Sequence, residues 1–165
     1  MKILYLHGLD SFLQDDRRAV LQQYATIYAP VLDYKGTPNL FEKLQETYHD
    51  VDAIIGSSAG GLVTYYLAQA LQKPCLLFNP ALTFRSEMPI ATRFNRSYTP
   101  IYANCNRLTG RSASFFGQCL ELLRNDISKN QNVEIHLINK MSHSYPIDIF
   151  RKETEFFIKM IHQNL

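Results

Sequence analysis

Short apolar runs alternate with longer amphipathic stretches along this chain of 165 residues, and this alternation constrains its fold most strongly. The apolar runs predict strands at residues 2–6, 27–32, 51–55, 74–78, 101–103 and 133–138. The amphipathic stretches predict helices at residues 15–24, 39–49, 59–71, 113–126 and 146–162. Strands and helices in this order form βαβ units, which build a parallel sheet with helices on both faces. We therefore expect an α/β fold, a three-layer sandwich around a mostly parallel sheet of about six strands, in one domain spanning residues 1–165.

Two local signals add detail to this fold. Pro30 cannot donate a hydrogen bond to a neighbouring strand, so the strand at 27–32 is expected at an edge of the sheet. Asn39 precedes a helical pattern, and Glu42 follows three residues later. This spacing predicts that Asn39 caps the helix that begins there.

The composition is that of an ordinary folded protein, with 46% hydrophobic residues, 19% charged residues and a formal net charge of +2. This balance gives no reason to expect nucleic acid or a membrane as a partner. No apolar run approaches the roughly 18 residues of a membrane span, and no signal peptide is evident. The three cysteines are widely spaced, which is typical of reduced thiols, and no Cys or His pair has metal-ligand spacing. We expect a cytoplasmic protein that binds no metal.

Functional groups in a parallel sheet gather beyond the carboxyl ends of its strands. In this sequence the predicted strand ends are followed by chemically active or turn-forming residues: 7–9, 33–34, 56–60, 79–80, 104–106 and 142–143. The site is therefore expected along this one edge of the sheet.

The strongest motif at this edge is G-x-S-x-G at residues 56–60, with a predicted strand before it and a predicted helix after it. This context is that of a nucleophile elbow, a sharp turn that exposes the central serine at the start of a helix. Ser58 is then the candidate nucleophile. A plain Gly/Ser-rich turn and a phosphate-binding loop are alternatives, although this segment lacks the lysine of a P-loop.

A base and an oxyanion hole can be placed at the same edge. His143 follows the last predicted strand, from which it can reach a nucleophile at the third strand. The backbone N–H groups of Leu9 and Ala59 can together stabilise a developing oxyanion. An incidental loop histidine and a simple turn at His7–Leu9 are the structural alternatives.

Three segments carry a resemblance to a known family: LYLHGL at residues 4–9, IIGSSAGG at 54–61 and LFNPAL at 77–82. In this order they resemble the small α/β-hydrolases of the YqiA-like esterase type. The tail SHSYPIDIF at 142–150 is similar to the histidine-bearing end of small serine hydrolases. The resemblance implies an α/β-hydrolase fold with Ser58 as nucleophile, His143 as base, and the N–H groups of Leu9 and Ala59 as the oxyanion hole.

The sequence departs from this family where the acid of the triad is expected. The stretch YANCNRLTGR at residues 102–111 contains no Asp or Glu, and Asn106 lies closest to the acid position. An amide can orient the histidine ring but cannot supply the charge that stabilises an imidazolium. Asn106 could serve as a weak orienter, or the protein could have lost catalysis. A third option is another carboxylate, and the candidates are Asp33, Asp10, Glu87 and Asp148.

These features predict a serine hydrolase, an esterase or thioesterase that cleaves a small acyl ester through an acyl-enzyme without a cofactor. The alternative is a catalytically degenerate α/β-hydrolase-like protein that binds a small molecule.

A polar, Arg-rich segment at residues 81–99 is expected to form a short cap or insertion, because it fits neither the strand nor the helix pattern. Arg93 and Arg96 are candidates for binding an anionic substrate such as a phosphate-bearing thioester. A solvated polar loop is the simpler interpretation of this segment.

Overall fold

The computed structural model describes residues 1–87, 101–107, 133–139 and 143–163. Its centre is a six-stranded sheet in the order β2-β1-β3-β4-β5-β6, in which each neighbouring pair is parallel. The strands are β1 (Lys2–Leu6), β2 (Thr26–Tyr28), β3 (Ala53–Ser57), β4 (Cys75–Phe78), β5 (Ile101–Arg107) and β6 (Val133–Asn139). The predicted parallel sheet of about six strands is confirmed, and β2 lies at its edge as Pro30 indicated.

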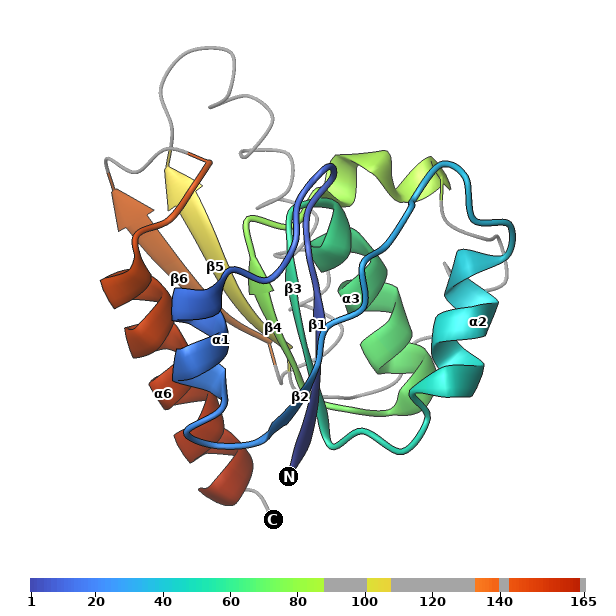
Figure 1. Ribbon diagram of the computed structural model, residues 1–165. Helices are drawn as coiled ribbons and strands as arrows, with labels where there is room; N and C mark the ends of the chain where they lie inside the picture. Colours follow the sequence, from blue (N-terminus) through green and yellow to red (C-terminus); the bar gives the residue numbers. More distant parts are fainter. Residues whose placement is uncertain (88–100, 108–132, 140–142, 164–165) are drawn as a thin grey trace.

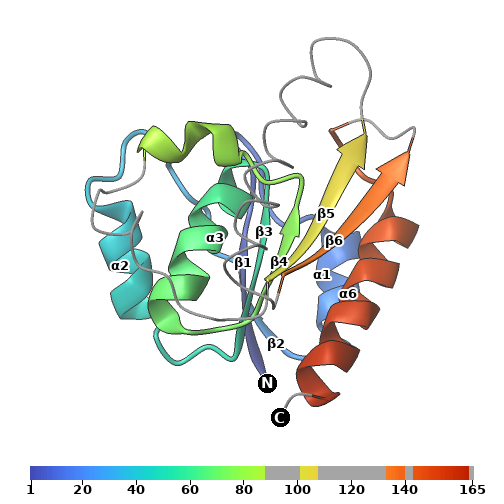
Figure 2. The ribbon, with the colours of Figure 1, turned by 180° about the vertical axis from the view of Figure 1, so that it is seen from behind.

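Helices cover both faces of the sheet, which makes three layers (Figure 1). The helices are α1 (Asp15–Leu21), α2 (Leu40–Thr47), α3 (Ala59–Leu71), the 3₁₀ helix η1 (Leu82–Glu87) and α6 (Ile147–Gln163). The helices α2 and α3 lie together on one face, and α1 and α6 lie together on the other, as the reverse view also shows (Figure 2). None of the helices in the described ranges is long and apolar enough to cross a membrane.

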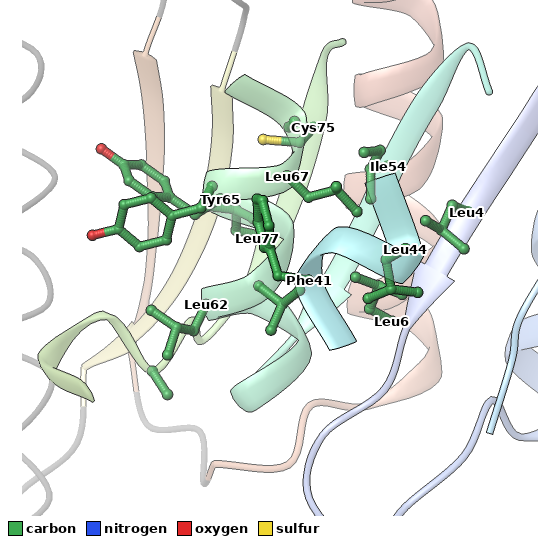
Figure 3. Packing of buried hydrophobic residues seen from close by; sticks show 14 of the residues in the cluster. Leu4, Leu6, Phe41, Leu44, Ile54, Leu62, Tyr65, Leu67, Cys75 and Leu77 are labelled. Atoms are coloured by element: carbon green, nitrogen blue, oxygen red, sulfur yellow. The ribbon is translucent and has the colours of Figure 1, made fainter. Parts of the chain in front are cut away.

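Alternating strand residues build a separate core on each face. Leu4 and Ile54 point toward α2 and α3, where they pack with Leu67 and Phe41 (Figure 3). Their neighbours along β1 and β3 point the other way and pack against α1 and α6. The central strands are therefore buried on both faces, as their continuous apolar runs require.

The ends of α1 and β2 differ from the prediction for local reasons. The helix α1 ends at Leu21 rather than at residue 24, because the N–H groups of Tyr24 and Ala25 both turn back to the Leu21 carbonyl. The strand β2 ends at Tyr28, before Pro30. The predicted helix at 113–126 lies outside the described residues.

Asn39 directly precedes α2 as predicted, but the predicted capping by its side chain is wrong. Asn39 has φ 52° and ψ 39°, the left-handed conformation, and its side chain makes no capping hydrogen bond. A capping side chain requires extended backbone geometry at that position. Asparagine instead supplies the left-handed turn by which the chain enters α2, since it adopts positive φ more readily than most residues.

Candidate active site

Ser58 lies in the sharp turn between β3 and α3 that the G-x-S-x-G motif predicts. Its φ of 54° and ψ of −117° are strained for a residue that carries a side chain. Its backbone N–H donates to the carbonyl of Phe78 at 3.0 Å, and its own carbonyl accepts from the N–H of Ala81 at 3.0 Å. These two bonds tie the turn to the end of β4 and hold the strained conformation in place.

The flanking glycines allow the strand and the helix to approach closely at this turn. A Cβ atom on Gly56 would overlap the Thr64 side chain and the carbonyl oxygen of Gly60. A Cβ atom on Gly60 would overlap the carbonyl oxygens of Leu6 and His7. The motif therefore needs glycine on both sides because backbone occupies the space that a side chain would take.

His143 reaches Ser58 from the far end of the sequence. Its Nε2 lies 3.0 Å from Ser58 Oγ, a hydrogen-bond distance, although 85 residues separate the two. Burial lowers the pKa of the His143 imidazole from its usual value, so the neutral form persists to lower pH. A neutral imidazole at this distance can accept a proton from the serine hydroxyl.

The loop that carries His143 is anchored on both sides. Asn79 is fully buried with φ 45°, and its Nδ2 donates to the His143 carbonyl at 2.9 Å. Two residues further on, the Tyr145 ring stacks on Phe78 with ring centroids 4.5 Å apart. The Arg17 guanidinium lies over the Tyr145 ring, 4.7 Å from its centroid, and donates to the Tyr145 carbonyl at 2.8 Å. The end of β4 thus positions both the nucleophile turn and the histidine loop.

The two residues whose N–H groups are expected to form an oxyanion hole, Leu9 and Ala59, lie at the same pocket as Ser58. Ala59 is the first residue of α3, where backbone N–H groups have no partner within the helix. Leu9 follows Gly8, which lies so close to Ser58 that a Cβ added to it would be 3.3 Å from Ser58 Cβ. Both Leu9 and Ala59 line the same pocket as Ser58.

His7 holds the loop that contains Leu9. Its Nε2 accepts from the N–H of Leu32 at 2.8 Å, so a neutral ring carries its proton on Nδ1, which donates to the Gly8 carbonyl at 2.6 Å. Because the peptide is planar and trans, fixing the Gly8 carbonyl also fixes the direction of the Leu9 N–H. The Tyr34 hydroxyl donates to the His7 carbonyl. These roles of His7 and Asn79 were not predicted, because the contacts from His7 to Leu32 and from Asn79 to His143 join segments that lie far apart in the sequence.

A pocket of about 760 Å³ opens beside Ser58, within the usual size range of small-molecule sites. It is lined by Leu9, Tyr34, Lys35, Thr37, Asn39, Leu40, Phe41, Glu42, Ser58, Ala59, Leu62, Val63, Ala81, Phe84 and His143. Residues from five of the predicted strand ends, or directly beside them, therefore meet at one pocket. Within the described ranges, no three His, Cys, Asp or Glu side chains are grouped to hold a metal ion.

Asn106 lies in a strand rather than in the loop where the sequence placed it. The strand β5 extends to Arg107 instead of ending at residue 103, and Asn106 pairs in register with Ile138 of β6. Pairing with β4 ends at Asn104, whereas pairing with β6 continues to Arg107 and keeps this polar stretch extended although it lacks an apolar run. The Asn106 side chain lies outside the described residues, so its place in a triad stays a prediction.

The carboxylates considered as substitutes are dispersed. Asp33 Oδ1 accepts from the N–H groups of Lys35 and Gly36 at 3.1 and 2.8 Å, so it closes its own turn. Asp10 and Asp148 are both exposed, in the connection after β1 and in the first turn of α6. Their assignment as a triad acid also stays a prediction.

The remaining candidate residues, Glu87, Arg93 and Arg96, belong to the expected cap at residues 81–99. Its first part forms η1, which ends at Glu87, and Phe84 from this helix lines the pocket. Arg93 and Arg96 lie outside the described residues.

Two other histidines serve local structure. His136 of β6 lies between Glu134 and Glu153, with its ring nitrogens 2.9 and 2.5 Å from their carboxylates. Burial opposes its protonation, but the two carboxylates outweigh this effect and raise the pKa of His136. His49 Nδ1 contacts the carbonyl of Glu46 at 2.8 Å, at the end of α2. Neither residue lines the pocket.

Comparison with protein families gives one assignment. A model of the uncharacterised protein family UPF0227 matches residues 2–113, which include Ser58, Ala59 and the loop after β1. No curated protein sequence matches this chain.

Solved structures resemble the whole chain at low sequence identity. An esterase from Pyrococcus furiosus is 14% identical, with a TM-score of 0.64 over 97% of this chain and 81% of its own. SOBER1 from Arabidopsis thaliana is 16% identical, with a TM-score of 0.64 over 98% of this chain and 99% of its own. A bacterial esterase of the hormone-sensitive lipase family is 15% identical, with a TM-score of 0.66 over 98% of this chain and 77% of its own. At these identities the likeness concerns the fold.

Proposed function

This chain belongs to the uncharacterised protein family UPF0227 and has the α/β-hydrolase fold, and we propose that it is a serine esterase or thioesterase. The observation that carries the proposal is the distance of 3.0 Å between Ser58 Oγ and His143 Nε2. A hydroxyl on a strained elbow beside a neutral imidazole is the arrangement that activates a serine for acyl transfer. A protein that only binds a small molecule has no need for this pair.

The first half of the proposed reaction forms an acyl-enzyme. Ser58 Oγ bonds to the substrate carbonyl carbon while its proton passes to His143 Nε2. The carbonyl oxygen becomes an oxyanion, which accepts hydrogen bonds from the N–H groups of Leu9 and Ala59. The intermediate then collapses, the bond from carbon to the leaving oxygen or sulfur breaks, and His143 returns the proton to the departing alcohol or thiol.

The second half releases the acid by the same groups. Water replaces the leaving group and bonds to the carbonyl carbon as His143 Nε2 takes its proton. Collapse of this second intermediate breaks the bond to Ser58 Oγ, which regains the proton from His143. The products are a carboxylic acid and an alcohol or thiol, and no cofactor or metal enters the sequence of steps.

A fluorophosphonate probe tests the assignment of the nucleophile. The wild-type protein is expected to be labelled, the Ser58→Ala protein is not, and the Ser57→Ala protein is labelled as the wild type is. Ser57 is a matched control because it precedes Ser58 in the same motif but lies at the end of β3. Labelling is read by intact mass after a fixed time.

Two outcomes of this experiment contradict the proposal. Equal labelling of wild type and Ser58→Ala would place the reactive group elsewhere. A wild type that is not labelled and does not turn over p-nitrophenyl acetate would favour the small-molecule-binding alternative.

The acid side of the pH profile follows from His143. Only its neutral imidazole can accept the serine proton, and burial lowers its pKa below the usual value of 6.5. As pH falls through this lowered pKa, His143 becomes protonated and kcat/KM is lost. We expect the midpoint of this loss below about pH 6.5 when hydrolysis is followed at constant ionic strength. A midpoint above that value would contradict the arrangement.

A further inference from the structure

Among the described residues, most of the pocket lining lies to one side of Ser58. Its walls come from the β2–α2 connection, the first turn of α2, the first turns of α3 and η1. These elements lie together on one face, whereas α6, which follows the His143 loop, lies on the other (Figures 1 and 2). A substrate bound at Ser58 therefore has this pocket space toward α2 and α3.

This asymmetry distinguishes the two ends of an ester. His143 must protonate the leaving group, so that group lies toward the His143 loop. The acyl group is the other substituent of the carbonyl carbon and lies away from His143. The pocket space toward α2 and α3 is consequently on the acyl side.

The walls on that side are mainly apolar. Leu62 and Phe41 are buried members of the core between the sheet and its two helices, so the pocket floor continues that core (Figure 3). Phe84 is half exposed and closes one side from η1. Burial raises the pKa of the Tyr34 phenol, which keeps this side chain neutral. Burial of a substrate's methylene groups against an apolar surface of this kind stabilises the complex.

The charges along the pocket do not select for a charged chain. Among the described lining residues, the fixed charges are one cation, Lys35, and one anion, Glu42. Both are exposed, where water screens them, and their signs are opposite. These two charges therefore do not favour a charged acyl chain over a neutral one.

We propose that the pocket binds an uncharged, apolar acyl chain and thereby selects esters or thioesters with longer acyl chains over acetyl esters. This inference rests on the proposed function and specifies the substrate of that same site. The pocket's volume of about 760 Å³ is far larger than the volume that an acetyl group would occupy. A short chain would leave the apolar walls beside Ser58 in water.

The test is a series of p-nitrophenyl esters from acetate through butyrate and octanoate to dodecanoate. Each buried methylene contributes about 0.8 kcal/mol, or roughly fourfold in binding. Allowing for incomplete burial, kcat/KM for octanoate is expected to exceed that for butyrate by about tenfold or more. A parallel series of alkyl acetates, in which only the alcohol lengthens, is expected to show little change.

Phe84 and Phe12 provide a matched pair of variants. Both are exposed phenylalanines, but only Phe84 lines the pocket. Phe84→Asp places a charge against the chain and is expected to reduce the octanoate-to-acetate ratio of kcat/KM about tenfold. Phe12→Asp is expected to leave the ratio unchanged.

The outcomes separate this inference from the proposed function. Turnover with equal kcat/KM for all acyl lengths, or a preference that appears only in the alcohol series, would overturn the acyl-chain assignment and leave the serine hydrolase intact. An unchanged ratio in Phe84→Asp would do the same. Absence of both turnover and fluorophosphonate labelling would overturn the two together.

Discussion

Alanine at Ser58 or at His143 is expected to lower kcat for ester hydrolysis by about 10⁴- to 10⁶-fold, and alanine at both to lower it no further. The reason is the single hydrogen bond between Ser58 Oγ and His143 Nε2, through which the two side chains act as a unit. Without the hydroxyl the base has no proton to accept, and without the base the hydroxyl stays a weak nucleophile. Single-turnover kinetics on a p-nitrophenyl ester measure all three variants.

A matched control separates the histidine's chemistry from a general effect of removing an imidazole. His49→Ala removes an exposed ring at the end of α2 that does not line the pocket, and it is expected to keep full activity. Independent losses that multiply in the double variant would show that Ser58 and His143 do not work together. Retained activity in either single variant would contradict its proposed role.

Gly60→Ala is expected to destabilise the protein by about 3 kcal/mol, although alanine normally stabilises a helix. Gly60 belongs to the first turn of α3, and a Cβ atom there would overlap the carbonyl oxygens of Leu6 and His7. Backbone atoms in a buried strand end cannot move aside cheaply, so the helix would have to shift. Chemical denaturation measures the loss of free energy of unfolding.

Gly36→Ala is the control for this prediction. Its added Cβ would also overlap an oxygen, but that oxygen belongs to the exposed side chain of Asp33. The flexible carboxylate can turn away, but it then gives up its exposed hydrogen bonds to the Lys35 and Gly36 N–H groups, and we expect a loss of about 1 kcal/mol. Similar losses for Gly36→Ala and Gly60→Ala would mean that backbone crowding at the elbow is not the cause.

The central strands and the nucleophile turn could be predicted because their causes are local. Residues 2–6 form β1 and residues 59–71 form α3 as the apolar pattern indicated, and the G-x-S-x-G spacing between a strand and a helix predicted the sharp turn at Ser58. The position of His143 beside Ser58 followed from topology, because parallel strands bring their carboxyl ends to one edge.

The features that were not predicted depend on contacts between loops. Asn39 matched a capping pattern, but the chain enters α2 through a left-handed residue, and a local pattern does not contain that turn. The bonds from His7 to Leu32 and from Asn79 to His143 join segments that lie apart in sequence. The length of β5 was underestimated because its last three residues are held by pairing with β6, beyond the end of its pairing with β4, rather than by apolar residues of their own.

The nucleophile and the pocket walls come from different parts of the chain. Ser58 follows β3, which has hydrogen-bonded strands on both sides, whereas Leu40 and Phe84 belong to elements at the periphery of the sheet. Substitutions at the periphery leave the pairing of the central strands intact. Related genes can therefore diverge in the molecules they accept while inheriting one reaction, and a protein engineer can vary the same positions for the same purpose.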